Sequence, residues 1–122
     1  MNVQVKIKNL PEIRAAFAKS PRVMTKNLNQ AIRRVGLEIG ADSRRNTPVD
    51  TGRLRSSHYE NFTNLKGIVG TDTNYDFFVH EGTRFMKARP FLAQAVQENE
   101  RFTDKEFTKA VQDTLDEIGR SV

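Results

Sequence analysis

The chain has 122 residues, which is the size of one domain. It contains no cysteine, which excludes disulfide frameworks, cysteine nucleophiles and cysteine-ligated zinc. No apolar run approaches the length that spans a bilayer, and the first residues lack the apolar segment of a signal peptide. We therefore expect one domain over residues 1–122, with no membrane partner, in the cytoplasm.

The net charge of +5 is unevenly distributed along the chain. Residues 1–93 carry 16 basic and 8 acidic side chains, whereas residues 94–122 carry 4 basic and 7 acidic ones. A basic body with an acidic tail is typical of a solvated surface, but it also predicts complementary contacts between copies of the chain. A basic nucleic-acid-binding module is an alternative, although the basic residues form no continuous run.

Two helices are expected after an N-terminal strand. Residues 1–8 alternate apolar and polar side chains, which predicts the strand, and a short helix follows over residues 11–19. Ser20 and Pro21 then favour a new helix start. Apolar residues at steps of three or four extend this amphipathic helix over roughly 25 residues. Its apolar stripe comprises Met24, Leu28, Ile32, Val35 and Ile39.

Two glycines interrupt the long predicted helix on one of its faces. Gly36 and Gly40 are four residues apart, and each costs about 1 kcal/mol relative to alanine. Either another backbone approaches closely at this face, or the glycines are merely tolerated. Pro48 is expected to end the helix and to hold Thr47 in extended geometry.

The second half of the chain predicts a hairpin and a C-terminal helical region. Segments 54–62 and 65–71 favour two paired strands, with a bulge or strand end at Gly67 and Gly70. Residues 74–82 favour a short helix or a strand, and residues 83–90 a projecting basic loop with two large apolar side chains. Residues 91–122 are expected to be helical, with a bend near 99–104. The order predicts an α+β fold, in which the long N-terminal helix and the C-terminal helix pack on a small, mostly antiparallel sheet.

The motifs that resemble catalytic sites are weak. Asp50, Thr51 and Gly52 reproduce the triplet of aspartic proteases, but the long helical patterns do not suit that all-β class, and a turn explains the triplet better. His80 and Glu81 lack the second histidine of a zinc-binding helix. We therefore expect no enzyme, no cofactor and no metal, with an aspartic protease as a remote alternative.

Three segments, in order, resemble the signatures of one phage family. They are residues 47–55 (TPVDTGRLR), residues 69–83 (VGT, NY and VHEGT), and residues 86–92 (MKARPFL). The family is the gene-product-ten-like morphogenesis proteins of tailed phages. Its members are small proteins of the head–tail junction, described as tail-completion, tail-terminator-like or neck proteins. The resemblance covers about residues 20–100.

This resemblance implies a structural virion protein without catalytic activity. It implies a homo-oligomer, expected to be a hexameric ring, at the virion neck on top of the tail, assembled in the host cytoplasm. The expected partners are the head connector or stopper and the tail-tube or tail-terminator proteins. DNA would pass through the lumen and be touched nonspecifically at most.

Two groups of residues are expected at the contacts with other subunits or with DNA. The loop is predicted to carry subunit or partner contacts, because interfaces favour Phe, Met and Arg. The loop residues are Arg84, Phe85, Met86, Lys87 and Arg89. Arginines of the long helix are candidates for facing the lumen and DNA. These arginines are Arg33, Arg34, Arg44 and Arg45.

A third group is expected to shape the turn between the long helix and the hairpin. Asp and Thr side chains bond to backbone amides in turns, and glycine supplies the required conformation. The turn residues are Pro48, Asp50, Thr51, Gly52 and Arg53.

Overall fold

A computed structural model describes residues 10–47, 55–72 and 90–120 of the chain. The fold is α+β, as expected, with helices packed on a small antiparallel sheet. The strand expected at 1–8, the turn at 48–53, the element at 74–82 and the loop residues 83–89 lie outside the described residues. The described elements are α1 (Leu10–Lys19), α2 (Pro21–Asn46), β1 (His58–Thr63), β2 (Lys66–Thr71), α5 (Phe91–Glu98) and α6 (Glu100–Arg120).

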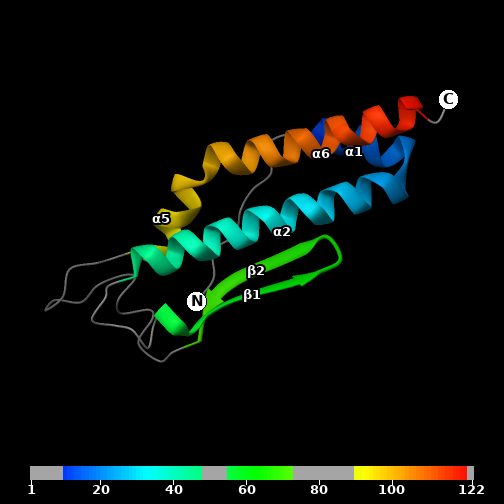
Figure 1. The fold of residues 1–122 in the computed structure, drawn as a ribbon. Helices are drawn as coiled ribbons and strands as arrows, with labels where there is room; N and C mark the ends of the chain where they lie inside the picture. The colour runs from blue at the N-terminus through cyan, green and yellow to red at the C-terminus, as the bar shows by residue number, and fades with distance from the viewer. Residues whose placement is uncertain (1–9, 48–54, 73–89, 121–122) are drawn as a thin grey trace, which may run out of the picture.

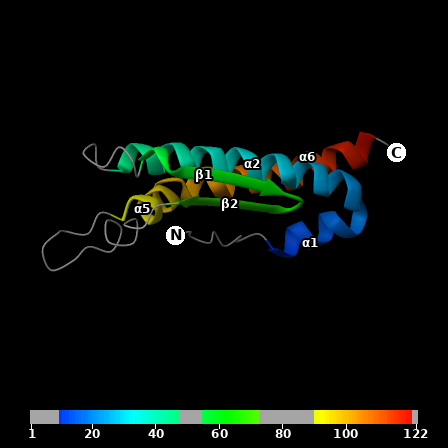
Figure 2. The same ribbon diagram turned by 90° about the horizontal axis from the view of Figure 1, so that it is seen from below.

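Helix α2 is the central element (Figure 1). The β1–β2 hairpin covers one side of it, and α6 covers the opposite side together with α1. Viewed from below, both strands run lengthwise along α2 (Figure 2). Helix α6 therefore packs mainly on α2 and α1. Of the two C-terminal helices, α5 supplies buried residues to the apolar cluster that contacts the sheet. None of the described helices is long and apolar enough to cross a bilayer.

The ends of α2 follow the predicted signals. Ser20 precedes the helix in extended geometry (φ −154°, ψ 90°), and Pro21 occupies its first turn, where a missing N–H costs nothing. At the other end Thr47 is extended (φ −72°, ψ 133°), as a residue before proline prefers. Residues 21–46 therefore form one continuous helix.

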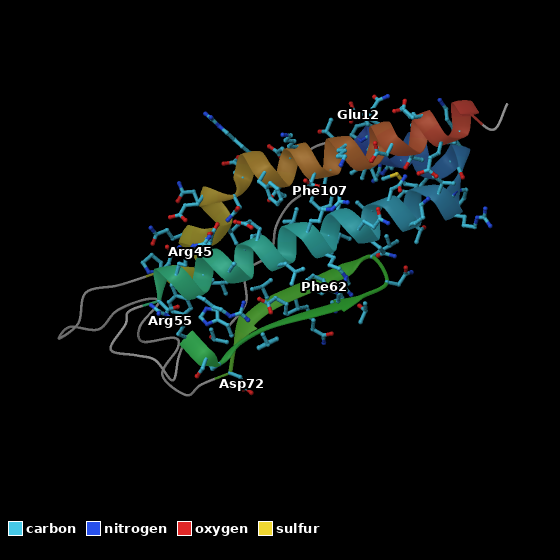
Figure 3. All side chains as sticks on the ribbon, in the orientation of Figure 1. Glu12, Arg45, Arg55, Phe62, Asp72 and Phe107 are labelled. Atoms are coloured by element: carbon cyan, nitrogen blue, oxygen red, sulfur yellow. The ribbon has the colours of Figure 1, made fainter. Side chains whose placement is uncertain are left out.

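Two apolar clusters lie along α2, and the second also reaches the hairpin through Val69 of β2. Figure 3 shows Phe107 between α6 and α2, in the first cluster. The first cluster joins α1, α2 and α6 through Ile13, Ala16, Met24, Leu28, Ala31, Phe107, Ala110 and Val111. The second cluster joins α2 to α5 through Val35, Ile39, Phe91, Leu92 and Ala95.

The bend expected near 99–104 falls at Asn99, between α5 and α6. The Asn99 side chain is buried, and its Nδ2 donates to Asp42 Oδ2 of α2 (2.6 Å) and to the Ala95 carbonyl (2.8 Å). Thr103 Oγ1 donates to the Asn99 carbonyl (2.8 Å). The same two carbonyls also accept backbone N–H groups, Ala95 from Asn99 (3.2 Å) and Asn99 from Thr103 (2.8 Å), so the side chains add to the hydrogen bonds across the bend.

The hairpin lies directly against the two glycines of α2. A Cβ atom at Gly36 would lie 2.5 Å from Cε1 of Phe62, and one at Gly40 would overlap the Glu60 carboxylate. Figure 3 shows Phe62 between the hairpin and α2. A close approach is therefore the reason for these glycines. The approaching groups are side chains of β1 and not a second backbone, which corrects that part of the expectation.

The hairpin has a continuous register, so a bulge at Gly67 or Gly70 is absent, whereas the alternative of a strand end is met, because β2 begins and ends one residue beyond these glycines. Pairing runs from His58 opposite Thr71 to Thr63 opposite Lys66 without interruption. Gly67 lies opposite Phe62, and a Cβ there would lie 2.9 Å from Cγ2 of Ile32 and 3.2 Å from the Phe62 ring. Glycine at this position makes room for two apolar side chains.

The two-residue turn of the hairpin is held by α2. Leu65 has a positive φ of 57°, a conformation that disfavours a side chain by roughly 1–2 kcal/mol. Its N–H donates to Asn29 Oδ1 (2.7 Å), and Asn29 Nδ2 donates to Asn64 Oδ1 (3.0 Å). The Asn29 side chain thus compensates for a turn sequence that is unfavourable by itself.

Replacing Gly36 by alanine should destabilise the protein. The new methyl group must displace the Phe62 ring, and overpacking of this kind costs about 1–3 kcal/mol, more than the helix-propensity gain of about 1 kcal/mol. Gly119→Ala is the matched control, because a Cβ there meets nothing within 4 Å. Denaturant unfolding should show a lower midpoint for Gly36→Ala and an equal or higher one for Gly119→Ala. A rise in both variants would contradict the packing account.

Replacing Leu65 by glycine should stabilise the protein. Glycine removes the penalty of the left-handed conformation and adds a smaller entropy cost, which leaves a gain of about 0.5–1 kcal/mol. Leu65→Ala, which keeps the Cβ, should bring no such gain. Thermal unfolding of both variants measures the difference, and equal melting temperatures would mean that the turn is not strained.

Candidate interaction surface

One side of α2, between the hairpin and α6, is open to solvent. Its exposed side chains recur at helical spacing along most of the helix. We call this side the outer face of α2. The outer face consists of Gln30, Arg33, Arg34, Leu37, Glu38 and Arg45.

Two of the four candidate arginines, Arg33 and Arg44, contact side chains of the hairpin. The Arg33 guanidinium lies 5.0 Å from the centre of the Phe62 ring. Arg44 makes a two-pronged ion pair with Glu60, with Nη1–Oε1 at 2.5 Å and Nη2–Oε2 at 3.0 Å, and also donates to the His58 carbonyl (3.3 Å). This planar geometry is specific to arginine, so a lysine at position 44 would not reproduce it.

The other two arginines pair with carboxylates of α6 and of α2 itself. Arg34 Nη1 lies 3.3 Å from Glu106 of α6. Arg45 pairs with Asp42 and lies 3.7 Å from Glu38. The four arginines therefore form no single row: Arg33 stacks on a ring, and the other three pair with carboxylates of the same chain. That they face DNA stays a prediction, and their charge is already partly neutralised.

Part of the opposite charge of the basic body (residues 1–93) and the acidic tail (residues 94–122) is neutralised by ion pairs within one chain. Lys26 of α2 pairs with Glu117 of α6 (3.0 Å), in addition to the pair between Arg34 and Glu106. Exposed ion pairs of this kind contribute only about 0–1 kcal/mol each. They nevertheless orient α6 along α2, and they remove those acidic groups from contacts between copies.

Leu37 is left uncovered at the centre of the outer face. It is 47% exposed, which is the highest value among the large hydrophobic residues of the described chain. One turn earlier, Arg33 turns toward Phe62 and Arg34 toward Glu106, so neither long side chain covers it. An apolar centre with an arginine rim suits a protein contact better than an unbroken charged face does.

A buried polar cluster closes the end of α2. Ser43 Oγ lies 2.7 Å from His58 Nε2, and His58 Nδ1 lies 3.0 Å from the Arg55 carbonyl. Because a carbonyl only accepts, these partners assign the proton of the neutral ring to Nδ1, with Ser43 donating to Nε2. Ser43 is fully buried and the second ring nitrogen meets a carbonyl instead of a carboxylate. The pair therefore joins the end of α2 to the start of β1 within the protein interior.

The described ends of all three sequence motifs meet at this cluster. Arg55 Nη2 donates to the Thr47 carbonyl (3.0 Å), which joins the two ends of the first motif. His58 pairs with Thr71 of the second motif across the hairpin. The His58 ring also meets the Phe91 ring of the third motif edge-on, with centroids 5.5 Å apart. We call this place the motif end.

Neither Ser43 nor His58 was predicted from the sequence to belong to a site. One signal was present, because Ser43 continues the stripe of small residues formed by Gly36 and Gly40. The loop residues 84–89 and the turn residues 48–53, which were predicted, lie outside the described residues. Within the described residues, no group of three or more His, Cys, Asp or Glu side chains is placed to hold a metal.

Comparison with protein-family models, with curated proteins and with solved structures finds no match for this chain. Its function must therefore be argued from the motifs and the geometry.

Replacing Ser43 by alanine should cost about 1–3 kcal/mol, because the buried His58 Nε2 loses its donor. The double variant Ser43→Ala/His58→Phe should cost less than the sum of the two single changes, since neither partner is then left unsatisfied. Urea unfolding of the four proteins measures this coupling. Strict additivity would show that the 2.7 Å contact contributes nothing to stability.

Proposed function

We propose that this chain is a structural protein of the head–tail junction of a tailed phage. It would act as a tail-completion, tail-terminator-like or neck protein, without enzymatic activity. Copies would assemble into a ring, expected to be hexameric, between the head connector or stopper and the tail-tube or tail-terminator proteins. The virion neck is the proposed location, and the host cytoplasm the place of assembly.

The observation that carries this proposal is the convergence of the three motifs. Segments 47–55, 69–83 and 86–92 are far apart in the sequence, yet Thr47, Thr71 and Phe91 belong to one cluster around His58. A rigid scaffold that gathers several loop segments at one end is a common way to build a binding surface. The described ends of the three segments that resemble the phage family are thus held together in one cluster, which supports treating them as parts of one functional unit.

Ring closure needs two unlike surfaces on each copy, because each subunit meets the next head to tail. The motif end, together with the predicted contact residues Phe85 and Met86 at the start of its third segment or just before it, would be one surface. The outer face of α2, with Leu37 at its centre, would be the other. These two surfaces are formed by different parts of the chain, as a ring interface requires.

The test measures the mass of the protein in solution, first alone and then with purified connector and tail-tube proteins. Light scattering should give a species near six times 13.9 kDa, either for the protein alone or after addition of purified connector and tail-tube proteins. Electron microscopy should then show rings. A chain that stays monomeric under both conditions would contradict the proposal.

Two variants locate the ring interface. Leu37→Glu should abolish the ring by placing a charge in an apolar contact, whereas Leu115→Glu, at a leucine of similar exposure on α6, should leave it intact. Phe85→Ala combined with Met86→Ala should also block assembly while the monomer stays folded by circular dichroism. Intact rings from both disruptive variants would exclude these surfaces as the interface.

A further inference from the structure

Arg55 holds a buried donor that the chain leaves unpaired. In the part of the chain that the structure describes, its Nε is the buried side-chain nitrogen without a hydrogen-bond partner. The residue is half-buried at the motif end, where its Nη2 donates to the Thr47 carbonyl (3.0 Å). Buried donors in native proteins almost always have an acceptor. The unpaired Nε therefore indicates that a group from another molecule completes the surroundings of Arg55.

The positive charge of Arg55 is also uncompensated. Three arginines of α2 each pair with a carboxylate of the same chain, whereas none of the ion pairs within residues 10–47, 55–72 and 90–120 includes Arg55. A half-buried charge without a counter-ion is unfavourable. The planar fork of guanidinium donors matches the two oxygens of a carboxylate, so a carboxylate suits this place.

Glu38 offers a carboxylate on the outer face of α2. It directly follows Leu37, and its side chain is 46% exposed. Its Oε1 lies 3.7 Å from Nη2 of Arg45, which has a closer partner in Asp42. A contact of this length is too long for a good hydrogen bond. The Glu38 carboxylate can therefore still accept hydrogen bonds from a partner.

Arg55 and Glu38 belong to different surfaces of the molecule. Figure 3 shows Arg55 and Arg45 on different sides of the end of α2, and Glu38 neighbours Arg45. The other charged residues of the outer face are arginines, which would repel Arg55. Glu38 is therefore the residue of the outer face whose charge complements Arg55 when two copies meet.

We propose that Arg55 of one copy pairs with Glu38 of the next copy in the ring. This inference rests on the proposed function, in which the motif end of one subunit meets the outer face of α2 of its neighbour. The Arg55 guanidinium would donate to both oxygens of the Glu38 carboxylate, next to the apolar contact of Leu37. Such a pair fixes the register of two surfaces and disfavours wrong ones.

Charge reversal tests the pair under the conditions in which the wild-type chain forms rings. Glu38→Arg and Arg55→Glu each place like charges opposite one another, so each should raise the protein concentration needed for half-assembly by at least about tenfold. Light scattering measures this concentration. Arg55→Glu also removes the bond to Thr47, but Glu38→Arg changes an exposed helical position and leaves every contact of the motif end in place.

A mixture of the two variants tests the pairing directly. When an Arg55→Glu subunit alternates with a Glu38→Arg subunit, opposite charges face each other at every interface. An equimolar mixture should therefore form rings at the wild-type concentration, although neither variant does so alone. Glu12→Arg is the matched control, because it reverses an exposed glutamate of α1 and should leave assembly unchanged.

The outcomes separate this pairing from the proposed function. Rings that persist in both single variants, a mixture that stays unassembled, or an equal loss in Glu12→Arg would each overturn the pairing, while the wild-type rings would still support the proposed function. A wild-type chain that forms no ring, alone or with connector and tail-tube proteins, would contradict the proposed function and the pairing together.

Discussion

The fold depends on how closely the hairpin can lie on α2, and small residues on one stripe of that helix set this distance. Alternate residues of β1 advance by about 6.7 Å and successive turns of α2 by about 5.4 Å, so each inward side chain of the strand meets the next turn of the helix. Phe62 lies over Gly36, Glu60 over Gly40, and His58 against Ser43. A larger side chain on this stripe would lift the strand and break the polar contacts that follow.

Because α2 is packed on two sides, its polar side chains are divided between two neighbours. Arg33 and Arg44 interact with the hairpin, and Arg34 interacts with α6. Two ion pairs along this helix, Lys26 with Glu117 and Arg34 with Glu106, therefore join the basic body to the acidic tail inside one molecule. Among the large hydrophobic residues of the described chain, Leu37 is the most exposed and is left for contact with other molecules.

The sequence predicted the helices well because their signals are local. Ser20 and Pro21 mark the start of α2, Thr47 before a proline marks its end, and apolar spacing locates the rest. The contacts of the candidate site were not predictable in the same way, because the pairing of Ser43 with His58 depends on how the hairpin is placed along α2. Of the two roles expected for Gly67, the bulge was wrong for the same reason, because the glycine makes room for Ile32 and Phe62 without a change of register.

The unbroken length of α2 also gives the molecule a fixed internal spacing. The helix has 26 residues, so its axis extends over about 39 Å between the junction with α1 and the motif end. No proline or helix break interrupts it after the first turn, and packing on two sides resists bending. A partner protein bound at the motif end and another bound beside α1 would therefore be held at a constant distance from each other, because the helix between them is stiff.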